Sequence, residues 1–578
     1  MYLFRLFLSF LPLHNPIGFG ASDFVEAAVA ILLVGLVFSR AAIEPAFLRL
    51  AQKTGWCMLL LGGLAAGLRL ALLPHFPVPT PAGADDFSYL LLGDTLAHLR
   101  LANPVHPMHW FFETNFVLQT PSYSSIYPIG PALALAFGQM LFGSPWTGVL
   151  LSAAAVSALC YWMLSGWTTP GWSLIGGLLA VCMFGPLSYW MNTYWGGAVS
   201  AIAGCLVFGA LPRLRDRQRA RHAILLGAGL GLQMLTRPYE SLFLDFGVAL
   251  FFLPWLRSAE GRRRLIRMAK PAALVVTPAA VLILLHNHAV TGSWTTLPYA
   301  LSRYRYGVPT SFTFQPNPQP HGDLAPNQWL YYQGQAAAHG DHPETAAAYL
   351  KRLDGRIGFY SFFLLPPLVL VLVFSLPSLR QFRFACLAIT LALFVFGSNF
   401  YPYFFPHYLA AIACIFLLAA VEGMARLSRW NLRGLAAGSD AARWLLFLCG
   451  AHFLFWYGLH AIGDPDILQA MDRYQNWDAI PMDDPEGRLA IRDILASQLG
   501  KQLVFVRYWP RHEYHEWIHN AADIDQATVV WAQDLGPSRD DDLVHYYRDR
   551  TAWILEPDAH PPRLTPYKPH TVQFEEVR

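Results

Sequence analysis

The chain has 578 residues, of which 54% are hydrophobic and 14% are charged, and its mean hydropathy is positive. Many apolar runs reach the roughly 17 to 25 residues that cross a bilayer as a helix, so the composition indicates a polytopic membrane protein and excludes a soluble one. The formal net charge of +3 is unevenly spread, because residues 461–578 hold 21 acidic and 12 basic side chains; they form an acidic tail, and no nucleic-acid partner is expected.

The first residues and the cysteines indicate neither a cleavable export signal nor a disulfide framework. Residues 1–20 contain a single basic residue, Arg5, and a broken apolar stretch without a clear cleavage site, so no cleavable signal peptide is expected. All seven cysteines lie within apolar runs, and none has the CxxC spacing of a zinc cluster. We expect them to be small core residues.

Hydropathy predicts about twelve transmembrane helices. They are expected at residues 24–40, 55–73, 147–165, 172–189, 196–212, 222–236, 240–256, 271–288, 359–375, 384–399, 408–425 and 443–460. Arginine-rich segments join some of their ends, at residues 40–53, 213–221, 257–270, 380–383 and 426–443. Because such segments usually face the cytoplasm, the other helix ends are expected on the outer side.

The segment Ile129–Phe142 is apolar enough to be counted as a further span. If it crossed the membrane, the arginine-rich segment 213–221 would lie on the same outer side as Asp85. The segment is also short for a crossing, and the prolines at its start suit the first turn of a helix. We therefore expect a helix on the outer membrane surface, within one long external loop over residues 74–146.

Two adjacent carboxylates, Asp85 and Asp86, end a proline-rich stretch near the start of this external loop. On position alone, capping of the next helix explains the pair as well as catalysis does, since acids near a helix N-terminus are stabilising. A second external loop, expected over residues 289–358, is rich in proline, glycine, tyrosine and histidine. Its aromatic side chains fit two interpretations, anchoring at the lipid headgroups or a lid over a site.

The acidic tail is predicted to be a small α/β domain. Helices are expected at 485–496 and 540–547, and strands at 503–508, 528–531 and 552–555. Strands that alternate with helices indicate a largely parallel sheet, and without a phosphate-binding glycine motif we expect a docking role. The chain is thus expected to divide into a membrane domain, 1–460, and a soluble outer domain, 461–578.

A group of histidines and glutamates in the tail has the composition of a metal site. Its members are His512, Glu513, His515, Glu516 and His519. A solvated surface is the favoured interpretation of this group.

Ionisable residues at membrane depth are costly, so each calls for a functional hypothesis. Arg69 lies about one turn inside its span, and its side chain is expected to reach toward the membrane surface. Arg237 and Glu240 flank a proline between two spans; Glu240 either pairs with Arg237 or contributes to a site. Asp245 lies deeper in the second of these spans.

Several of these residues are expected on one outer face, together with others from the loops. Arginine suits phosphate because its planar fork donates two parallel hydrogen bonds, and a carboxylate suits removal of a hydroxyl proton. The candidate catalytic residues are Asp85 and Asp86, and the candidate substrate-binding residues are Glu113, Arg237, Glu240, Arg303, Arg305, His407 and Tyr408.

The motif Asp-Asp-Phe-Ser-Tyr at residues 85–89 resembles the Asp-Glu-x-x-Tyr/Phe motif of GT-C glycosyltransferases, the superfamily of protein O-mannosyltransferases and lipid A aminoarabinose transferases. Phe112-Glu113 and the Tyr-Pro-Ile-Gly-Pro stretch at 127–131 resemble the pieces that lead into the surface helix of that family. Asn192 stands where relatives often have aspartate, and the Phe-Pro-His-Tyr stretch at 405–408 resembles a late Arg-Tyr motif with histidine in place of arginine. The whole chain also resembles a bacterial GT-C subgroup with a soluble C-terminal α/β tail.

The resemblance implies a GT-C-like membrane fold and sugar transfer, with inversion, from a polyprenyl-phosphate donor at the outer face of a bacterial inner membrane. Asp85 would accept the proton of the acceptor hydroxyl, and Asp86 and Glu113 would orient the reactants. Arg237, Arg303, Arg305 and His407 would hold the leaving phosphate. The acceptor could be a lipid, a glycan or a protein. No cofactor is expected. Aspartate at Asp86 in place of the usual glutamate, and asparagine at Asn192 in place of aspartate, weaken the case for a bound metal, but a divalent metal stays an open alternative.

Two other functional classes stay open. A transporter or lipid flippase would also have many spans and a few buried charges, but no internal repeat of the kind such proteins often show is evident. A catalytically inactive GT-C relative could act as a scaffold through its tail. The grouping of charges at one membrane face favours the enzyme.

Overall fold

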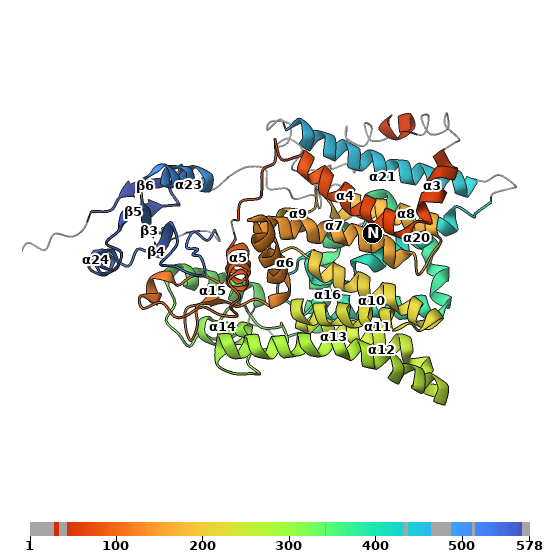
Figure 1. Ribbon diagram of the computed structural model, residues 1–578, viewed down its shortest axis with the longest axis horizontal. Coiled ribbons are helices and arrows are strands. Elements are labelled where there is room, and N and C mark those ends of the chain that lie inside the picture. The colour runs from red at the N-terminus through yellow and green to blue at the C-terminus, as the bar shows by residue number, and fades with distance from the viewer. Residues whose placement is uncertain are drawn as a thin grey trace, which may run out of the picture. The chain divides into compact units, whose positions relative to one another are not determined.

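The computed structural model describes residues 28–33, 43–81, 83–340, 343–431, 437–463, 487–510, 512 and 515–568. The chain forms two compact units, each built from three separate segments (Figure 1). The first unit takes Met1–Pro79, Trp146–Leu282 and Glu344–Ile480, and the second takes Thr80–Pro145, Ile283–Pro343 and Pro481–Arg578. The predicted division at residue 460, between membrane and water, stays a prediction.

The described residues of the first unit form helices joined by turns, without a strand, and many of these helices run side by side (Figure 1). Its α-helices are α3 (Ile43–Ala51), α4 (Thr54–Ala71), α7 (Pro145–Leu164), α8 (Pro170–Phe184), α9 (Tyr189–Asn192), α10 (Ala198–Arg217), α11 (Ala220–Thr236), α12 (Pro238–Phe252), α16 (Ala346–Arg356), α17 (Pro366–Val369), α18 (Leu372–Ser375), α19 (Phe382–Ser398), α20 (Ala413–Leu427) and α21 (Ala437–Ile462). Helix α13 (Ala259–Thr291) belongs to the first unit as far as Leu282, and its last turns are assigned to the second unit. Its 3-10 helices are η2 (Leu253–Arg257), η3 (Ile357–Phe363), η4 (Leu376–Arg380) and η5 (Pro406–Ile412).

Seven helices in the described part of the chain are long and apolar enough to cross a membrane, and one bent pair makes a possible eighth span. The seven are Thr54–Ala71, Pro145–Leu164, Ala198–Arg217, Pro238–Arg257, Ala259–Thr291, Pro406–Leu427 and Ala437–Ile462. The shorter apolar helices are Ile129–Phe142, Pro170–Phe184 and Phe382–Ser398. The chain is therefore a multi-pass membrane protein.

The count of long apolar helices differs from the twelve predicted spans because hydropathy measures composition and not continuity. The predicted span 359–375 falls on the bent pair, Ala346–Phe363 and Pro366–Arg380, which turns by 112°. A residue before proline is kept out of the helical conformation, so the chain breaks ahead of Pro366. The predicted span 24–40 lies mostly outside the described residues.

Small residues allow the helices of the first unit to pack closely. An added Cβ at Gly204 of α10 would come within 1.7 Å of the Ala411 carbonyl oxygen in η5. Close approach of backbones at glycine is the usual way in which membrane helices gain contact. All seven cysteines are reduced thiols, and only Cys182 among them is not fully buried.

The second unit combines the two predicted loops with the tail. Its helices are α5 (Ala84–Ala97), η1 (His109–Phe112), α6 (Ile129–Phe142), α14 (Pro298–Tyr306), α15 (Pro326–His339), α23 (Arg488–Ser497) and α24 (Pro537–Tyr546). The helix predicted at Ile129–Phe142 is α6, and it packs against α5, where an added Cβ at Gly93 would lie 2.8 Å from that of Leu135.

The tail holds a four-stranded sheet in the order β4-β3-β5-β6. Its strands are β3 (Lys501–Val506), β4 (Val529–Gln533), β5 (Arg550–Glu556) and β6 (Arg563–Pro566), and a short pair, β1 (Val117–Leu118) with β2 (Ser124–Ser125), lies in the first loop. β3 runs parallel to both neighbours, with Leu503 opposite Val530 and Ala552, while β6 is antiparallel to β5. The predicted small, largely parallel sheet is confirmed, with β6 as an additional edge strand.

The two faces of the sheet are covered by different parts of the second unit. Val504 and Val506 point to one face, where they pack with Ile491 of α23. Phe505 points to the other face and packs with Phe111 and Phe112, which belong to the first loop. The core of the tail is therefore completed by residues almost 400 positions earlier in the chain.

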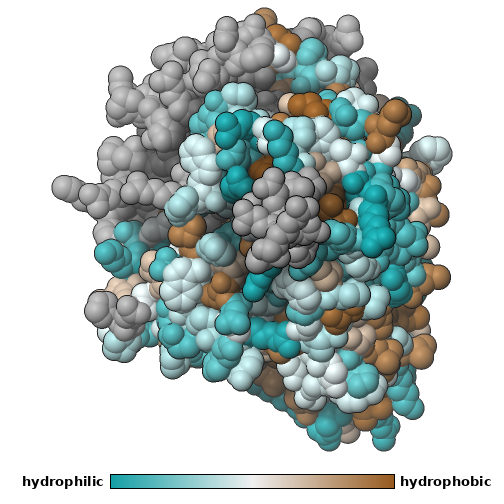
Figure 2. Space-filling view, turned by 90° about the vertical axis from the view of Figure 1, so that its left-hand side faces the viewer, coloured by the Kyte–Doolittle hydropathy of each residue, from teal (hydrophilic) through white to brown (hydrophobic). Residues whose placement is uncertain are grey.

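The aromatic side chains of the second loop divide between core and surface. Tyr306 and Tyr332 are buried, whereas Trp294, Tyr304 and Trp329 are exposed. Hydrophilic side chains cover most of the coloured face in Figure 2, with hydrophobic ones scattered among them. The loop thus uses some aromatics for packing and leaves others available to a lipid or ligand.

Candidate functional site

Asp85 and Asp86 lie in the first turn of α5, but their surroundings differ. Asp86 is buried, and its carboxylate accepts the N–H of Gly83, the N-cap residue, at 3.4 Å. Asp85 is partly exposed. The capping interpretation is therefore confirmed for Asp86, whereas the catalytic role of Asp85 stays a prediction.

The carboxylate of Asp85 is oriented by a tyrosine from the start of α6. The Tyr127 hydroxyl donates a hydrogen bond to Oδ1 of Asp85. Tyr89, one turn after Asp85 on α5, stacks on the Tyr127 ring with centroids 4.3 Å apart. Burial and the nearby Asp85 carboxylate raise the pKa of Tyr127 well above its ordinary value, so its hydroxyl remains a donor.

Glu113 connects the first loop with the second loop and the tail. Its Oε2 accepts hydrogen bonds from the Tyr306 hydroxyl at 3.0 Å and from Gln328 Nε2 at 3.3 Å. Its backbone oxygen accepts one from Gln533 Nε2 at 2.5 Å. Burial raises the pKa of Glu113. The hydrogen bonds from Tyr306 and Gln328 and the charge of Arg305 lower that pKa, but they oppose the rise only in part.

Arg303 and Arg305 lie at the end of α14 and hold loop backbone. Arg303 donates to the carbonyl oxygens of Pro309, at 3.1 Å, and Thr310, at 3.3 Å. Arg305 donates to the carbonyl oxygen of Thr120 at 2.6 Å and also to its hydroxyl. These contacts give both arginines a structural task, and phosphate binding by either stays a prediction.

The first unit contains a second group of predicted residues, around the break between α11 and α12. Glu240 is 2% exposed and accepts from Arg237 Nη1 at 3.4 Å and from the Tyr401 hydroxyl at 3.2 Å. The Arg237 guanidinium carbon lies 4.7 Å from the ring centroid of Tyr408. The predicted pair of Arg237 and Glu240 is present, and Tyr408 belongs to the same group.

His407 is buried beside this group. Its backbone N–H donates to the Tyr189 hydroxyl oxygen at 2.9 Å, and that hydroxyl lies 3.3 Å from Nδ1. The Trp195 ring lies at a T-shaped angle with its centroid 5.0 Å away. His407 therefore sits in an aromatic cage, where its ring is held in place.

The expectation that Arg69 reaches the membrane surface is wrong. Its side chain is fully buried, Nε donates to Asn192 Oδ1 at 2.7 Å, and the other two nitrogens donate to the carbonyl oxygens of Phe76, at 2.9 Å, and Pro77, at 3.0 Å. Burial inside a helical bundle cannot be read from one helix, because the acceptors come from distant segments.

The sequence did not single out Arg356, which the structure makes prominent. It is 5% exposed and donates to the carbonyl oxygens of Ser398, at 3.1 Å, and Tyr401. Its position just before the apolar run at 359–375 was the available signal. Arg356 fixes the backbone of Tyr401, the residue that binds Glu240.

The interpretation of the tail histidines and glutamates as solvated surface is wrong for Glu516. This carboxylate is 3% exposed and accepts from the Tyr508 hydroxyl at 2.6 Å. His512 pairs with Asp558 at 2.7 Å, while Glu513 lies outside the described residues. Among the residues that the structure describes, no group of three or more His, Cys, Asp or Glu side chains is placed to hold a metal ion.

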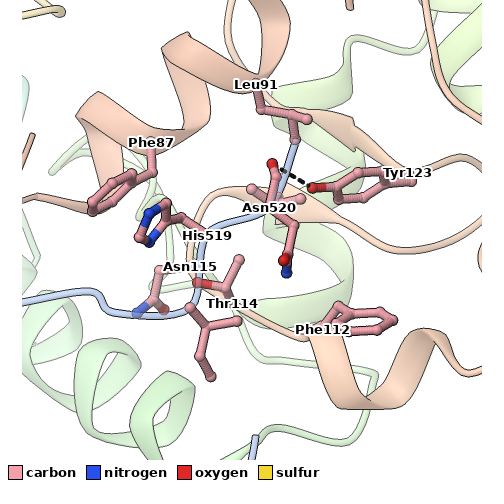
Figure 3. Close-up of a pocket in the computed structure, with 10 residues that line it drawn as sticks. Phe87, Leu91, Phe112, Thr114, Asn115, Tyr123, His519 and Asn520 are labelled. Carbon is pink, nitrogen blue, oxygen red and sulfur yellow. Dashed lines mark hydrogen bonds between the residues drawn. The ribbon is translucent and has the colours of Figure 1, made fainter. Parts of the chain in front are cut away.

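A small pocket lies between α5, the first loop and the tail segment (Figure 3). Its lining includes Phe87, Thr114, Asn115, His519 and Asn520. Its volume is about 10 Å³, close to the smallest space that holds one water molecule. It is therefore too small for a sugar and marks a tight packing contact.

No protein-family model matches the chain, and no curated protein matches it by sequence. The structure is similar to that of ArnT from Cupriavidus metallidurans bound to undecaprenyl phosphate, with 12% identity, 87% of this chain and 93% of that chain covered, and a TM-score of 0.50. The apo state of the same protein gives 12% identity, the same coverage and 0.49. An oligosaccharyltransferase from Archaeoglobus fulgidus gives 12% identity, covers 86% of this chain and 69% of that chain, and has a TM-score of 0.38. ArnT is an aminoarabinose transferase of the GT-C superfamily, so the fold predicted from the motifs is confirmed and the chain has the GT-C fold.

Proposed function

We propose that the chain is an integral-membrane inverting glycosyltransferase that moves a sugar from a polyprenyl-phosphate donor to an acceptor hydroxyl at the outer membrane face. The observation that carries the proposal is the placement of Asp85, a partly exposed carboxylate in the first turn of α5, oriented by Tyr127. The fold shared with ArnT, which was determined bound to undecaprenyl phosphate, supports the donor class.

In the proposed reaction Asp85 acts as the general base. The acceptor oxygen forms a bond to the anomeric carbon while the bond from that carbon to the phosphate oxygen breaks. The acceptor proton passes to the Asp85 carboxylate, and the electron pair of the broken bond leaves with polyprenyl phosphate. Tyr127 contributes by fixing the direction of the carboxylate, since proton transfer requires hydrogen-bond reach.

Arg237 is the residue that we assign to the leaving phosphate. A guanidinium can donate two parallel bonds to phosphate oxygens, and Glu240 with the Tyr408 ring holds this one in a defined orientation. Phosphate leaves as a stable anion, so stabilisation of its charge is the main requirement and no general acid is needed. Glu240, His407 and Tyr408 would support this arginine, and Arg303 and Arg305 are the remaining candidate cations.

We place the protein in a bacterial inner membrane, with Asp85 and the tail facing the periplasm. The arginine-rich segments at residues 213–221 and 257–270 support this orientation, because such segments remain on the cytoplasmic side. The acceptor would be a lipid, a glycan or a protein. No cofactor takes part in the proposed reaction, and activity in the presence of EDTA would test whether a divalent ion contributes.

The proposal is tested by Asp85→Asn, with Asp493→Asn, at an exposed position of the tail, as the matched control. Glycolipid and glycan mass spectrometry of a deletion strain identifies the missing product, and transfer from the corresponding polyprenyl-phosphate sugar is then measured with purified protein. Loss of a general base predicts a rate roughly 10²- to 10⁴-fold lower in Asp85→Asn, with unchanged expression and thermal stability. Undiminished transfer would reject Asp85 as the base, and transport into vesicles without a transfer product would favour the transporter.

A further inference from the structure

The face of α5 that carries Phe87 and Leu91 points away from Asp85. Successive residues of a helix turn by about 100°, so Phe87 lies roughly opposite Asp85, and Leu91 follows Phe87 one turn later. The His519 ring stacks on the Phe87 ring with centroids 4.2 Å apart and an interplanar angle of 20° (Figure 3). The back of the helix that carries the proposed base is therefore covered by the tail.

Hydrogen bonds fasten the same tail segment to both ends of this contact. Gly83, the N-cap of α5, forms an antiparallel β-bridge with His515. Near the other end of the helix, Asp94 Oδ2 accepts the backbone N–H of Ala522 at 2.7 Å. The segment from His515 to Ala522, hereafter the clamp segment, thus follows α5 from its first residue to its third turn.

Glu516 of the clamp segment also holds the first loop. Its Oε2 accepts from Asn115 Nδ2 at 3.1 Å and from the Asn115 backbone N–H at 3.4 Å, while its Oε1 accepts from the Tyr508 hydroxyl at 2.6 Å. A carboxylate that is 3% exposed is costly unless such bonds are made. Asn115 lies two residues after Glu113, so this single carboxylate fixes the loop that carries another proposed site residue.

The aromatic rings that pack around Phe87 are uncharged, and the Arg488 guanidinium lies beside them. Burial and the Arg488 guanidinium lower the pKa of His519 to about 3, so its ring is uncharged under physiological conditions. The Arg488 guanidinium carbon lies 5.1 Å from the Phe87 ring centroid and 4.4 Å from that of Trp517. The contact is therefore held by ring packing and is insensitive to pH near neutrality.

We propose that Glu516 and His519 are positioning residues for Asp85, and that the tail serves as a structural part of the catalytic unit. This inference rests on the proposed function. Small displacements of a reacting group reduce the rate strongly, even when the change is remote from the substrate. Loosening the clamp segment should therefore lower kcat and leave the KM for the donor nearly unchanged.

The test compares His519→Ala with His519→Phe, and Glu516→Ala with Glu516→Gln, in the full-length protein. Phenylalanine keeps a ring over Phe87, and glutamine keeps an acceptor for Asn115. Arg563→Ala, at an exposed position of β6, is the control in the same sheet. Hydrogen exchange of residues 84–92 is measured without substrate, and kcat and donor KM are measured separately.

We expect both alanine variants to exchange faster over residues 84–92 and to lose about ten- to a hundredfold in kcat, with donor KM within about twofold of wild type. His519→Phe and Glu516→Gln should recover most of the activity, and Arg563→Ala should match wild type. Unchanged exchange in α5, or a change in donor KM alone, would overturn the proposal. If an alanine variant does not fold, Phe87→Leu tests the same stack from the helix side with the same outcomes. Failure of the wild type to transfer sugar would reject the proposed function, whereas the exchange result still decides whether the clamp segment orders α5.

Discussion

Arg69 Nε donates a hydrogen bond to Asn192 Oδ1 at 2.7 Å across 123 residues of sequence. The same guanidinium binds the carbonyl oxygens of Phe76 and Pro77, where the chain leaves α4 for the external loop. One buried arginine therefore joins the short helix α9 to the exit of a span. Asn192 supplies the acceptor oxygen on α9.

Replacing Arg69 with methionine should destabilise the protein. Each buried acceptor that loses its partner costs about 1–3 kcal/mol, and three acceptors are affected. We expect a clearly lower midpoint of thermal unfolding in detergent for Arg69→Met than for wild type. The midpoint of Arg69→Lys should lie between those of wild type and Arg69→Met. Arg49→Met, at an exposed position of α3, is the control, and equal midpoints for the two methionine variants would contradict the assignment.

Removing the Tyr127 hydroxyl should affect catalysis more than folding. Tyr127→Phe keeps the stack on Tyr89 but loses the hydrogen bond to Asp85. We expect kcat to fall by about tenfold, which corresponds to roughly 1.4 kcal/mol in the barrier, with little change in donor KM. The exposed Tyr304→Phe provides the comparison. A wild-type kcat in Tyr127→Phe would show that the hydroxyl has no part in orienting the base.

The raised pKa of Glu113 should make the free energy of unfolding decrease as the pH rises. Its pKa is raised above the ordinary value of 4.5, so between that value and the raised one the folded protein binds more protons than the unfolded chain. The free energy of unfolding therefore falls as the pH rises through this window. Glu113→Gln, which keeps an acceptor for Tyr306, should unfold at a higher temperature than wild type at pH 7.5 and at the same temperature near pH 4.

The exposed Glu260→Gln should show no such difference between the two pH values. If Glu113→Gln is more stable yet less active, the buried charge is retained for function at the expense of stability, as often happens in active sites. An equal effect at both pH values would mean that the charge of Glu113 does not influence stability.

Arg237→Lys should separate charge from geometry at the proposed phosphate site. Lysine keeps the positive charge near Glu240 but cannot donate two parallel hydrogen bonds. We expect the donor KM to rise by about tenfold, equivalent to roughly 1.4 kcal/mol of lost binding, while the amount of folded protein is unchanged. An unaltered donor KM would show that a cation other than Arg237 binds the phosphate.

Unlike Arg237→Lys, Arg305→Ala should lower the stability of the protein and leave donor binding unchanged. Its guanidinium binds the Thr120 carbonyl oxygen and hydroxyl, so the variant loses bonds that hold one loop to another. We expect a lower unfolding midpoint and an unchanged donor KM among the molecules that remain folded. A rise in donor KM without loss of stability would instead place Arg305 at the phosphate.

The fold class and several elements were predictable because their signals are local. The helix at Ile129–Phe142 followed from its apolar run with prolines at its start, and the strands of the tail followed from short apolar runs between turns. The α5 acids followed from a five-residue motif. Each of these signals lies within a stretch shorter than about twenty residues.

The partners of those elements were not predictable in the same way. Glu516 and Asn115 are 401 residues apart, and no periodicity or motif links them. The same holds for Arg69, whose acceptor on α9 lies 123 residues further along the chain. Burial of a charged residue depends on which segments meet in space, so a hydropathy profile assigns such residues to the surface by default.

The native thiols make the chain a favourable host for site-directed labelling. Six of the seven cysteines are buried, and Cys182 is only partly accessible. A cysteine introduced at an exposed position such as Ser497 would therefore be the preferred target of a bulky maleimide that cannot cross membranes. Whether that reagent reacts in intact cells would then report the side of the membrane that the tail occupies, without replacement of the natural cysteines.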